Sequence, residues 1–309
     1  MKLKLLSYNV DGLPDKLDLY DLPWIFRPLV WIYELIKGTH IIVVNDNTNR
    51  IEDFKNIGNF LKSSGSDIID VQEDFNFHNE LVKALPDYNC GTHQGGFDLS
   101  KIFSKVRWFP YPRYKADGLN LFAKKNLIIQ NEEIVRWKDS YGYFSHGNDK
   151  LTFKGFRHYT ITIKKGLSIE VYIVHMDADY YHPEKCPDVS GDIEARKSQL
   201  LQLSDHIIKA NYTNPIVVIG DTNLCPNYSW DEELIKNWFI EYINLHVTGL
   251  KAEEVIPEGF KDVDRCFIIN NPRSTFKIDV DNSYAFYFET VGYSDHKPLM
   301  VNLEIENRK

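Results

Sequence analysis

The chain repeats one pattern, in which a short apolar run stops abruptly at polar residues. Runs rich in β-branched residues predict strands at 3–10, 67–72, 157–163, 169–175, 216–220, 266–269 and 299–305. Residues 50–61 have helical spacing instead, with Ile51, Phe54, Ile57 and Leu61 on one face and Gly65 as a stop signal. Asp192 is expected to cap a second helix. Strands and helices in alternation predict a layered α/β architecture.

No repeat, low-complexity tract or Gly/Ser linker divides the chain, which predicts a single domain over residues 1–309. An aromatic insertion at about 17–44 stands apart from the pattern. Its part 22–36 is nearly all apolar and contains Trp24 and Trp31, but it is shorter than the roughly 20 residues that span a bilayer. Two interpretations remain open: a buried helix or covering loop, and an exposed aromatic flap that rests on a membrane or grips a lipid-like substrate.

The composition narrows the classes of molecule that the chain is expected to bind. The formal net charge of -8 argues against binding nucleic acid through a broad basic face, although a bound metal could still supply positive charge to a nuclease site. The basic and aromatic stretch 101–115 is either an anion-binding loop or a solvated loop. We expect a monomer whose substrate is a phosphorylated small molecule or lipid, with peripheral membrane contact through 22–36 and nucleic acid not favoured.

Cysteine use and the first residues bear on the compartment. The four cysteines are scattered without a CxxC pair, which indicates reduced packing residues rather than a zinc cluster or a disulfide framework. The apolar stretch at the amino terminus is too short for a signal peptide and is better interpreted as a first strand. The expected location is therefore cytoplasmic, with possible attachment at a membrane surface.

Polar residues of compatible chemistry follow the predicted strands. They are Asn9, Glu73, the pair His175 and Asp177, the pair Asp221 and Asn223, and Asp295 with His296 just before the last strand. Strand ends can converge on one rim of a sheet, where α/β folds place their sites. Carboxylate and amide oxygens favour Mg²⁺, Mn²⁺ or Ca²⁺, and histidines can transfer protons or contact a phosphoryl oxygen.

These motifs resemble the ordered set of the endonuclease/exonuclease/phosphatase superfamily. The matching stretches are SYN at 7–9, VQED at 71–74, VHMD at 174–177, IGDTN at 219–223 and YSDHKP at 293–298, and they cover nearly the whole chain. The DGLN stretch at 117–120 and the KG pair at 154–155 are similar to further elements of its sphingomyelinase and inositol-phosphatase branches. The resemblance implies a DNase I-like, four-layered α/β sandwich of two packed mixed sheets with helices on the outer faces.

The resemblance also implies roles for individual residues. The metal, Mg²⁺ or alternatively Mn²⁺ or Ca²⁺, would be held by Asn9 and Glu73, with Asp295 as either a further ligand or an orienting group. The implied catalytic group is His175, Asp221, Asn223, His296 and Asp264, in which Asp264 would orient His296. The implied contacts to substrate phosphate are Asn120, Lys154 and Asp177.

The function expected on these grounds is divalent-metal-dependent hydrolysis of a phosphoester. A lipid-like or small phosphorylated head group is the favoured substrate, as in sphingomyelinases and inositol phosphatases. Two alternatives are a DNA or RNA nuclease and a binding module that has lost catalysis. Motifs of other hydrolases, GxSxG, GxxxxGK[ST] and HExxH, are absent from the sequence.

Overall fold

The computed structural model describes most of the chain. The described residues are 1–12, 48–75, 77–94, 97–98, 113–114, 116–141, 149, 153–179, 181, 183, 188–257, 259, 262–288 and 293–308, with backbone alone at 48–50, 97–98 and 113–114. The aromatic insertion at about 17–44 lies outside them, as does the stretch 101–115 apart from the backbone of 113–114.

Two sheets of six strands each form the centre of the molecule. The first has the order β13 (Phe276–Tyr287), β14 (Leu299–Asn307), β1 (Lys2–Asn9), β2 (Ile68–Gln72), β6 (Asn120–Lys124), β3 (Tyr88–Cys90). The second has the order β11 (Lys251–Glu254), β12 (Asp264–Asn270), β10 (Ile216–Asp221), β9 (Leu167–His175), β8 (Gly155–Lys164), β7 (Ile128–Arg136). A separate ribbon pairs β4 (Phe97–Asp98) with β5 (Arg113–Tyr114). In each large sheet a central pair is parallel, β1 with β2 and β9 with β10, which makes both sheets mixed.

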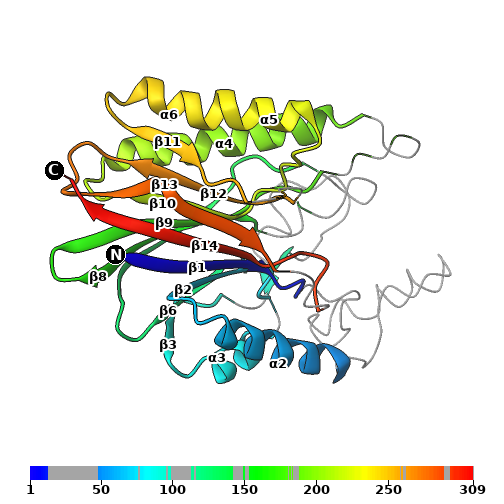
Figure 1. Cartoon of the computed structure of the whole chain (residues 1–309). Helices are drawn as coiled ribbons and strands as arrows, with labels where there is room; N and C mark the ends of the chain where they lie inside the picture. Colours follow the sequence, from blue (N-terminus) through cyan, green and yellow to red (C-terminus); the bar gives the residue numbers. More distant parts are fainter. Residues whose placement is uncertain are drawn as a thin grey trace.

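Helices cover the two outer faces (Figure 1). The first sheet carries α2 (Thr48–Ser63) and α3 (His78–Ala84). The second carries α4 (Ser190–Ala210), α5 (Ser229–Ile235), the π-helical turn η3 (Lys236–Ile240) and α6 (Glu241–His246). The arrangement of helices, sheet, sheet and helices confirms the predicted four-layered sandwich.

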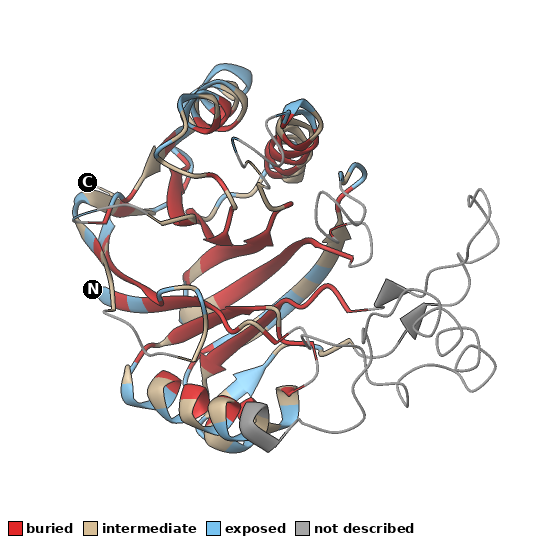
Figure 2. Ribbon diagram, turned by 90° about the vertical axis from the view of Figure 1, so that its right-hand side faces the viewer, coloured by how far each residue is buried: buried red, intermediate tan, exposed pale blue. Residues whose placement is uncertain are grey.

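Three apolar clusters hold these layers together, and strands with two buried faces contribute to more than one (Figure 2). In β1, Leu3 and Leu5 point into the core between the sheets, whereas Leu6 and Tyr8 point toward α2 and α3. Each such fully buried large apolar side chain stabilises the fold by about 1.5–3 kcal/mol. Both faces of β1 are buried from Leu5 onward, whereas Lys2 and Lys4 near its start are exposed.

Some local predictions were wrong or incomplete. Asp192 does not cap α4, because the helix begins two residues earlier with Val189 at the N-cap position, and Asp192 lies buried in the first turn. Strands β7 and β13 were not predicted; both carry exposed polar positions, and β13 also has a register shift between Asp279 and Tyr284.

The cysteine prediction holds in part. Cys90, Cys225 and Cys266 have free thiols, but only Cys266 is a buried packing residue, and Cys90 is exposed. Cys186 lies outside the described residues. Among the described helices, none has the length and apolar character needed to cross a membrane.

Candidate active site

Strand register brings the predicted polar residues to one rim of the sandwich. In the second sheet His175 on β9 lies opposite Asp221 on β10, and Asp221 lies opposite Asp264, the first residue of β12. In the first sheet Asn9 ends β1 beside Gln72 of the parallel strand β2, which places Glu73 just past the same edge. His296 lies in the segment that leads into β14, the antiparallel neighbour of β1. Six residues from both sheets therefore meet at this edge.

The amide of Asn9 joins the two halves of the site. Its Nδ2 donates to Glu73 Oε1 at 3.2 Å and to Asp221 Oδ2 at 3.0 Å, and lies 3.5 Å from His296 Nε2. Its Oδ1 accepts from the backbone N–H of Asp11 at 3.0 Å. Ligation of a cation through the oxygen of Asn9 therefore requires the amide to turn over.

The backbone is strained where it presents the site. Glu73 has a φ of 61° and Asn223 a φ of 52°, a left-handed conformation that non-glycine residues adopt at a cost. A tight turn holds Glu73, whose carbonyl accepts from the N–H of Phe75 at 2.8 Å. Gly12 permits this turn, because a Cβ at that position would lie 2.1 Å from the carbonyl oxygen of Glu73. The packed surroundings thus fix the directions of both side chains.

His296 is oriented by a buried carboxylate. Its Nδ1 lies 2.8 Å from Asp264 Oδ2, and Asp264 is fully buried. The carbonyl of Asp264 accepts from Tyr287 Oη at 2.7 Å. Burial opposes the charged imidazolium, but the nearby charges of Asp264 and Asp221 outweigh it and raise the pKa of His296 to about 11. His296 is therefore held as a proton donor with its Nε2 facing the site.

His175 has the opposite character. Its Nε2 lies 3.4 Å from Asp221 Oδ2 and 3.8 Å from Glu73 Oε1, and neither ring nitrogen has a hydrogen-bond partner among the described residues. Burial, with help from the charges of Lys154 and His296, lowers its pKa well below the usual value. Trp137 Nε1 donates to its backbone carbonyl at 2.7 Å and fixes the strand end. The result is a neutral imidazole available to a ligand.

Lys154, Asn223 and Asp177 lie around the strand end that carries His175. Lys154 is buried, pairs with Asp149 at 2.6 Å and donates to the carbonyl of Met176 at 3.1 Å. Asn223 Nδ2 donates to the same carbonyl at 3.0 Å. Asp177 accepts from the N–H of Tyr141 at 2.7 Å, and burial together with Asp149 raises its pKa to about 6. Their side chains thus have protein partners already, and their roles toward substrate stay predictions.

Asn120 and Asp295 are less closely tied to the rim. Asn120 Nδ2 lies 3.3 Å from His78 Nδ1, and its Oδ1 accepts from the N–H of Leu121 at 2.8 Å. Asp295 is exposed, and its Oδ1 lies 3.5 Å from Ser294 Oγ. Neither has a contact with Asn9 or Glu73 among the described interactions, so the phosphate role of Asn120 and the metal role of Asp295 also stay predictions.

Two acidic residues that sequence reasoning missed also belong to the site. Asp262 offers a carboxylate oxygen within 4.8 Å of donor atoms of both Asp264 and His296. Asp11 adds its charge to the environment of Glu73, whose pKa is raised, chiefly by burial. Each lies two residues from a predicted site residue, and this alternation is the signal that could have identified them.

The donor set fits a hard divalent cation. Glu73 and Asp221 approach one amide nitrogen, and each adds negative charge to a largely buried space. Burial of carboxylates without compensation is costly, and a cation between them would offset it. Oxygen donors of this kind suit Mg²⁺, Mn²⁺ or Ca²⁺.

Solved structures with the same fold are known, although no protein-family model matches the sequence and comparison with curated proteins finds no match. Beta toxin from Staphylococcus aureus is 16% identical, with a TM-score of 0.62 over 97% of this chain and 99% of that one. Sphingomyelinase C from Streptomyces griseocarneus is 14% identical, with a TM-score of 0.62 over 98% and 99%. A humanized D. rerio TDP2 is 15% identical, with a TM-score of 0.59 over 98% and 99%. A second beta toxin structure contains bound magnesium ions. At these identities the similarity establishes the fold.

Proposed function

We propose, from the DNase I-like fold that this chain shares with the endonuclease/exonuclease/phosphatase superfamily, that it is a divalent-metal-dependent phosphoester hydrolase acting on a lipid-like or small phosphorylated head group. One observation carries the proposal. The amide of Asn9 contacts Glu73, Asp221 and His296, which joins groups of both sheets, and a neutral His175 lies beside Asp221.

Each residue of the group has a chemical task in this proposal. Asn9 and Glu73, with Asp295 as a further ligand, would hold the cation, which when bound neutralises charge that develops on a phosphoryl oxygen. Asp221 and Asn223 orient the attacking water, and the carboxylate of Asp221 accepts the proton that the water gives up as its oxygen bonds to phosphorus. The remaining steps belong to the two histidines.

The two histidines divide the proton chemistry. His296 carries a proton at Nε2 and is held in place by Asp264, so it can donate to an oxygen at the rim. His175 is neutral and has no described partner, so one ring nitrogen can donate a hydrogen bond to a phosphoryl oxygen.

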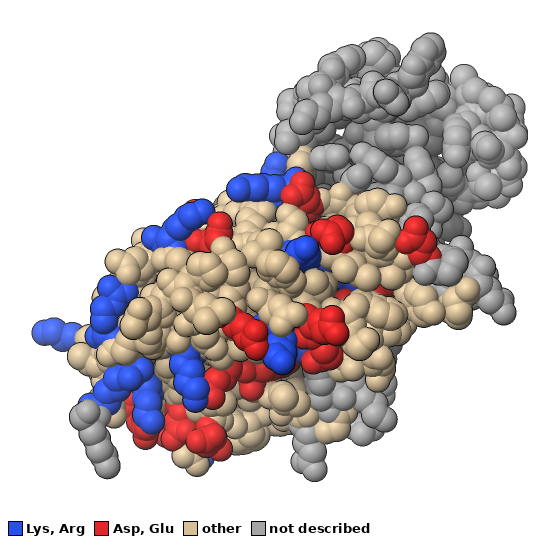
Figure 3. All heavy atoms as spheres, turned by 90° about the horizontal axis from the view of Figure 1, so that it is seen from above, with Lys and Arg blue, Asp and Glu red and all other residues tan. Residues whose placement is uncertain are grey.

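The surface supports a small or lipid-like substrate rather than a long nucleic acid. On the face that carries α4, α5 and α6, basic and acidic side chains lie interspersed (Figure 3). Several of them pair, as Lys209 does with Asp205 at 3.1 Å and Lys197 with Glu194 at 3.7 Å. The described residues on this face form no basic stripe of the kind that tracks a phosphate backbone, and the net charge of -8 points the same way. A sphingomyelinase C among the structures with this fold points to the same substrate class.

The test is release of phosphate or head group from a mixed panel, with Mg²⁺ and with EDTA. The panel holds sphingomyelin, phosphoinositides, inositol phosphates, single-stranded and duplex DNA, and RNA. We expect turnover of a lipid or inositol substrate that EDTA abolishes. Cleavage of nucleic acid alone would replace the proposed substrate class by a nuclease, and silence across the panel would indicate a binding module.

Variants connect the activity to the site. Glu73→Gln and His296→Gln should each remove most hydrolysis, because general acid–base groups and metal ligands typically contribute about 10²-fold or more. His246→Gln is the matched control, since His246 is exposed at the end of α6. Full activity in both site variants would refute the assignment whatever the fold.

A further inference from the structure

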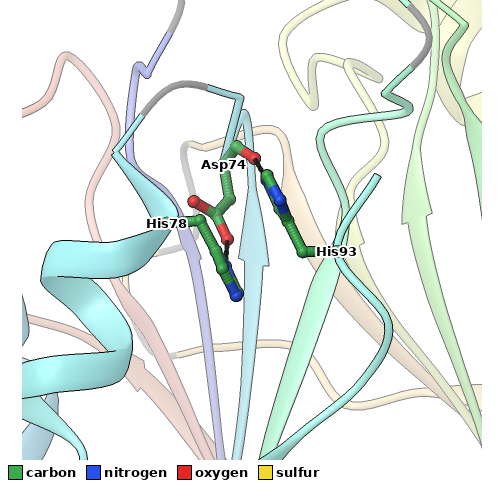
Figure 4. A group of neighbouring side chains, drawn as sticks. All are labelled: Asp74, His78 and His93. Atoms are coloured by element: carbon green, nitrogen blue, oxygen red, sulfur yellow. Dashed lines mark hydrogen bonds and ion pairs between the residues drawn. The ribbon is translucent and has the colours of Figure 1, made fainter. Parts of the chain in front are cut away.

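A second group of potential metal ligands lies next to the proposed active site. Asp74, His78 and His93 come from three segments: the turn after β2, the first residue of α3 and the segment after β3. One donor atom of each residue lies within 4.8 Å of the others. Figure 4 shows both imidazoles directed at Asp74, His78 toward its carboxylate and His93 toward its backbone carbonyl. The distances are 2.6 Å from His78 Nδ1 to Asp74 Oδ2 and 3.1 Å from His93 Nε2 to the carbonyl oxygen.

The carboxylate of Asp74 is incompletely satisfied. Asp74 is 1% exposed, and its Oδ1 has no hydrogen-bond donor among the described residues. A buried carboxylate oxygen without a donor or cation is costly and calls for a partner. The rings of His78 and His93 are stacked with centroids 4.0 Å apart, so two positive charges there would repel each other strongly. At least one imidazole is therefore neutral and offers a lone pair.

From this geometry we propose that Asp74, His78 and His93 bind a transition-metal ion of the zinc class, at a site separate from the oxygen-rich site at Asn9 and Glu73. Two imidazoles and one carboxylate are donors that suit Zn²⁺, in contrast to the carboxylate and amide donors of the neighbouring site. The ion takes the place of the proton between His78 Nδ1 and Asp74 Oδ2.

The donor atoms must shift and the rings must turn to hold the ion. Ligand atoms about 2.1 Å from a tetrahedral ion lie about 3.4 Å from one another. Donor atoms up to 4.8 Å apart therefore approach by up to about 1.4 Å, whereas His78 Nδ1 and Asp74 Oδ2, which are 2.6 Å apart, separate by about 0.8 Å. The parallel imidazoles rotate so that a nitrogen of each faces the ion. Both histidines are only partly buried, which leaves room for this rotation and a route for the ion.

A bound ion would act on the active site through the backbone. Asp74 directly follows Glu73, whose left-handed turn presents the carboxylate at the rim. Two hydrogen bonds already hold the backbone of this turn. The N–H of Asp74 donates to the carbonyl of Gly118 at 2.9 Å, and the N–H of Phe75 donates to the carbonyl of Glu73 at 2.8 Å. An ion on the Asp74 side chain would strengthen the links that His78 and His93 already make from this turn to α3 and to the segment after β3. The expected effect is structural, and it does not depend on which substrate is hydrolysed.

The test is Zn²⁺ binding by calorimetry to the full chain, freed of metal and held in excess Mg²⁺. We expect one molar equivalent of Zn²⁺ to bind and the thermal unfolding midpoint to rise with Zn²⁺ concentration. His78→Asn and His93→Asn should each weaken binding at least tenfold, while circular dichroism confirms that they fold. His246→Asn should bind as wild type.

A further variant separates this proposal from the proposed function. Glu73→Gln should lose hydrolysis but keep Zn²⁺ binding, because Glu73 is not one of the three ligands. The proposal is overturned if no Zn²⁺ binds in excess Mg²⁺, or if binding survives in both histidine variants. It is also overturned if binding disappears with Glu73→Gln, which would assign the zinc to the active site. Failure to find any phosphoesterase activity would leave each of the Zn²⁺-binding readouts intact.

Discussion

The pair of His296 and Asp264 allows the sharpest test of the active site, through the substitution Asp264→Asn. In the unchanged protein His296 Nδ1 lies 2.8 Å from Asp264 Oδ2. Asparagine has nearly the same shape as aspartate, and its side-chain oxygen can still accept a hydrogen bond from this nitrogen. The change therefore removes charge and keeps the volume. Any effect on hydrolysis then reports the electrostatic role of Asp264 rather than a cavity.

The expected loss of rate follows from the hydrogen bond between His296 and residue 264, which the substitution weakens. A hydrogen bond to a charged group contributes about 1.5–3 kcal/mol, which corresponds to about 10- to 150-fold in rate at 1.36 kcal/mol per tenfold. Stability should change little, because two effects oppose each other. Burial is the largest cause of the raised pKa of Asp264, about 7, so at pH 8 the folded protein holds a carboxylate that it disfavours, and the amide relieves this. The lost attraction to His296 acts in the other direction.

The assay compares kcat on the substrate identified by the panel with urea unfolding at pH 8. Asp281→Asn is the matched control, because it makes the same chemical change at an exposed position on β13. We expect Asp264→Asn to lower kcat by at least tenfold while its unfolding free energy stays within about 1 kcal/mol of wild type. A kcat within threefold of wild type would refute the orienting role, and an equal loss of activity and stability would show that Asp264 is structural.

Three further predictions follow from particular residues. Gly12→Ala should lower kcat/KM and cost about 1–3 kcal/mol of stability, because the Cβ of the alanine would lie 2.1 Å from the carbonyl oxygen of Glu73. Unchanged kinetics and an unchanged melting temperature would contradict this. Hydrogen bonds lower the pKa of Glu170 despite its burial, so its stabilisation is complete above pH 4.5 and is lost as pH falls through the lower folded-state pKa. Glu170→Gln should therefore flatten the acid limb of unfolding free energy against pH, and an unaltered limb would exclude this role. Replacing Trp24 and Trp31 by Ser should weaken sedimentation with liposomes, and unchanged sedimentation would remove the membrane hypothesis.

The layered fold could be predicted because its central strands are buried on both faces. The strand β10 is a continuous apolar run up to its polar end, and β1 has an apolar pair, Leu5 and Leu6, before its polar end. The edge strand β7 and the bulged strand β13 could not be recognised, because pairing with a neighbour, rather than an apolar run, defines them. Pairing is a property of chain segments far apart in the sequence, and local patterns do not record it.

The types of residue in the candidate site could be predicted from the sequence, but their arrangement in space could not. Asn9, Glu73, His175 and Asp221 stand out because each ends a strand or directly follows one. Their contacts depend on strand order, which places His175, Asp221 and Asp264 side by side across three strands. The left-handed backbone of Glu73 has no sequence signal, because glutamate rarely adopts it and only tertiary packing selects it. His78 and His93 lie on different segments of the chain, so no sequence motif connects them.

The division of the active site between the two sheets has a consequence for how the protein folds. Asn9, Glu73 and His296 belong to one sheet, and Asp221 and Asp264 belong to the other. A folding intermediate with either sheet formed alone would hold only half of the site and would bind the cation weakly. Cation binding should therefore have little effect on the rate of early folding. It should mainly slow unfolding, because the ion cross-links the sheets only after they have docked. Regain of hydrolysis during refolding should coincide with the slowest docking step, long after most secondary structure has formed.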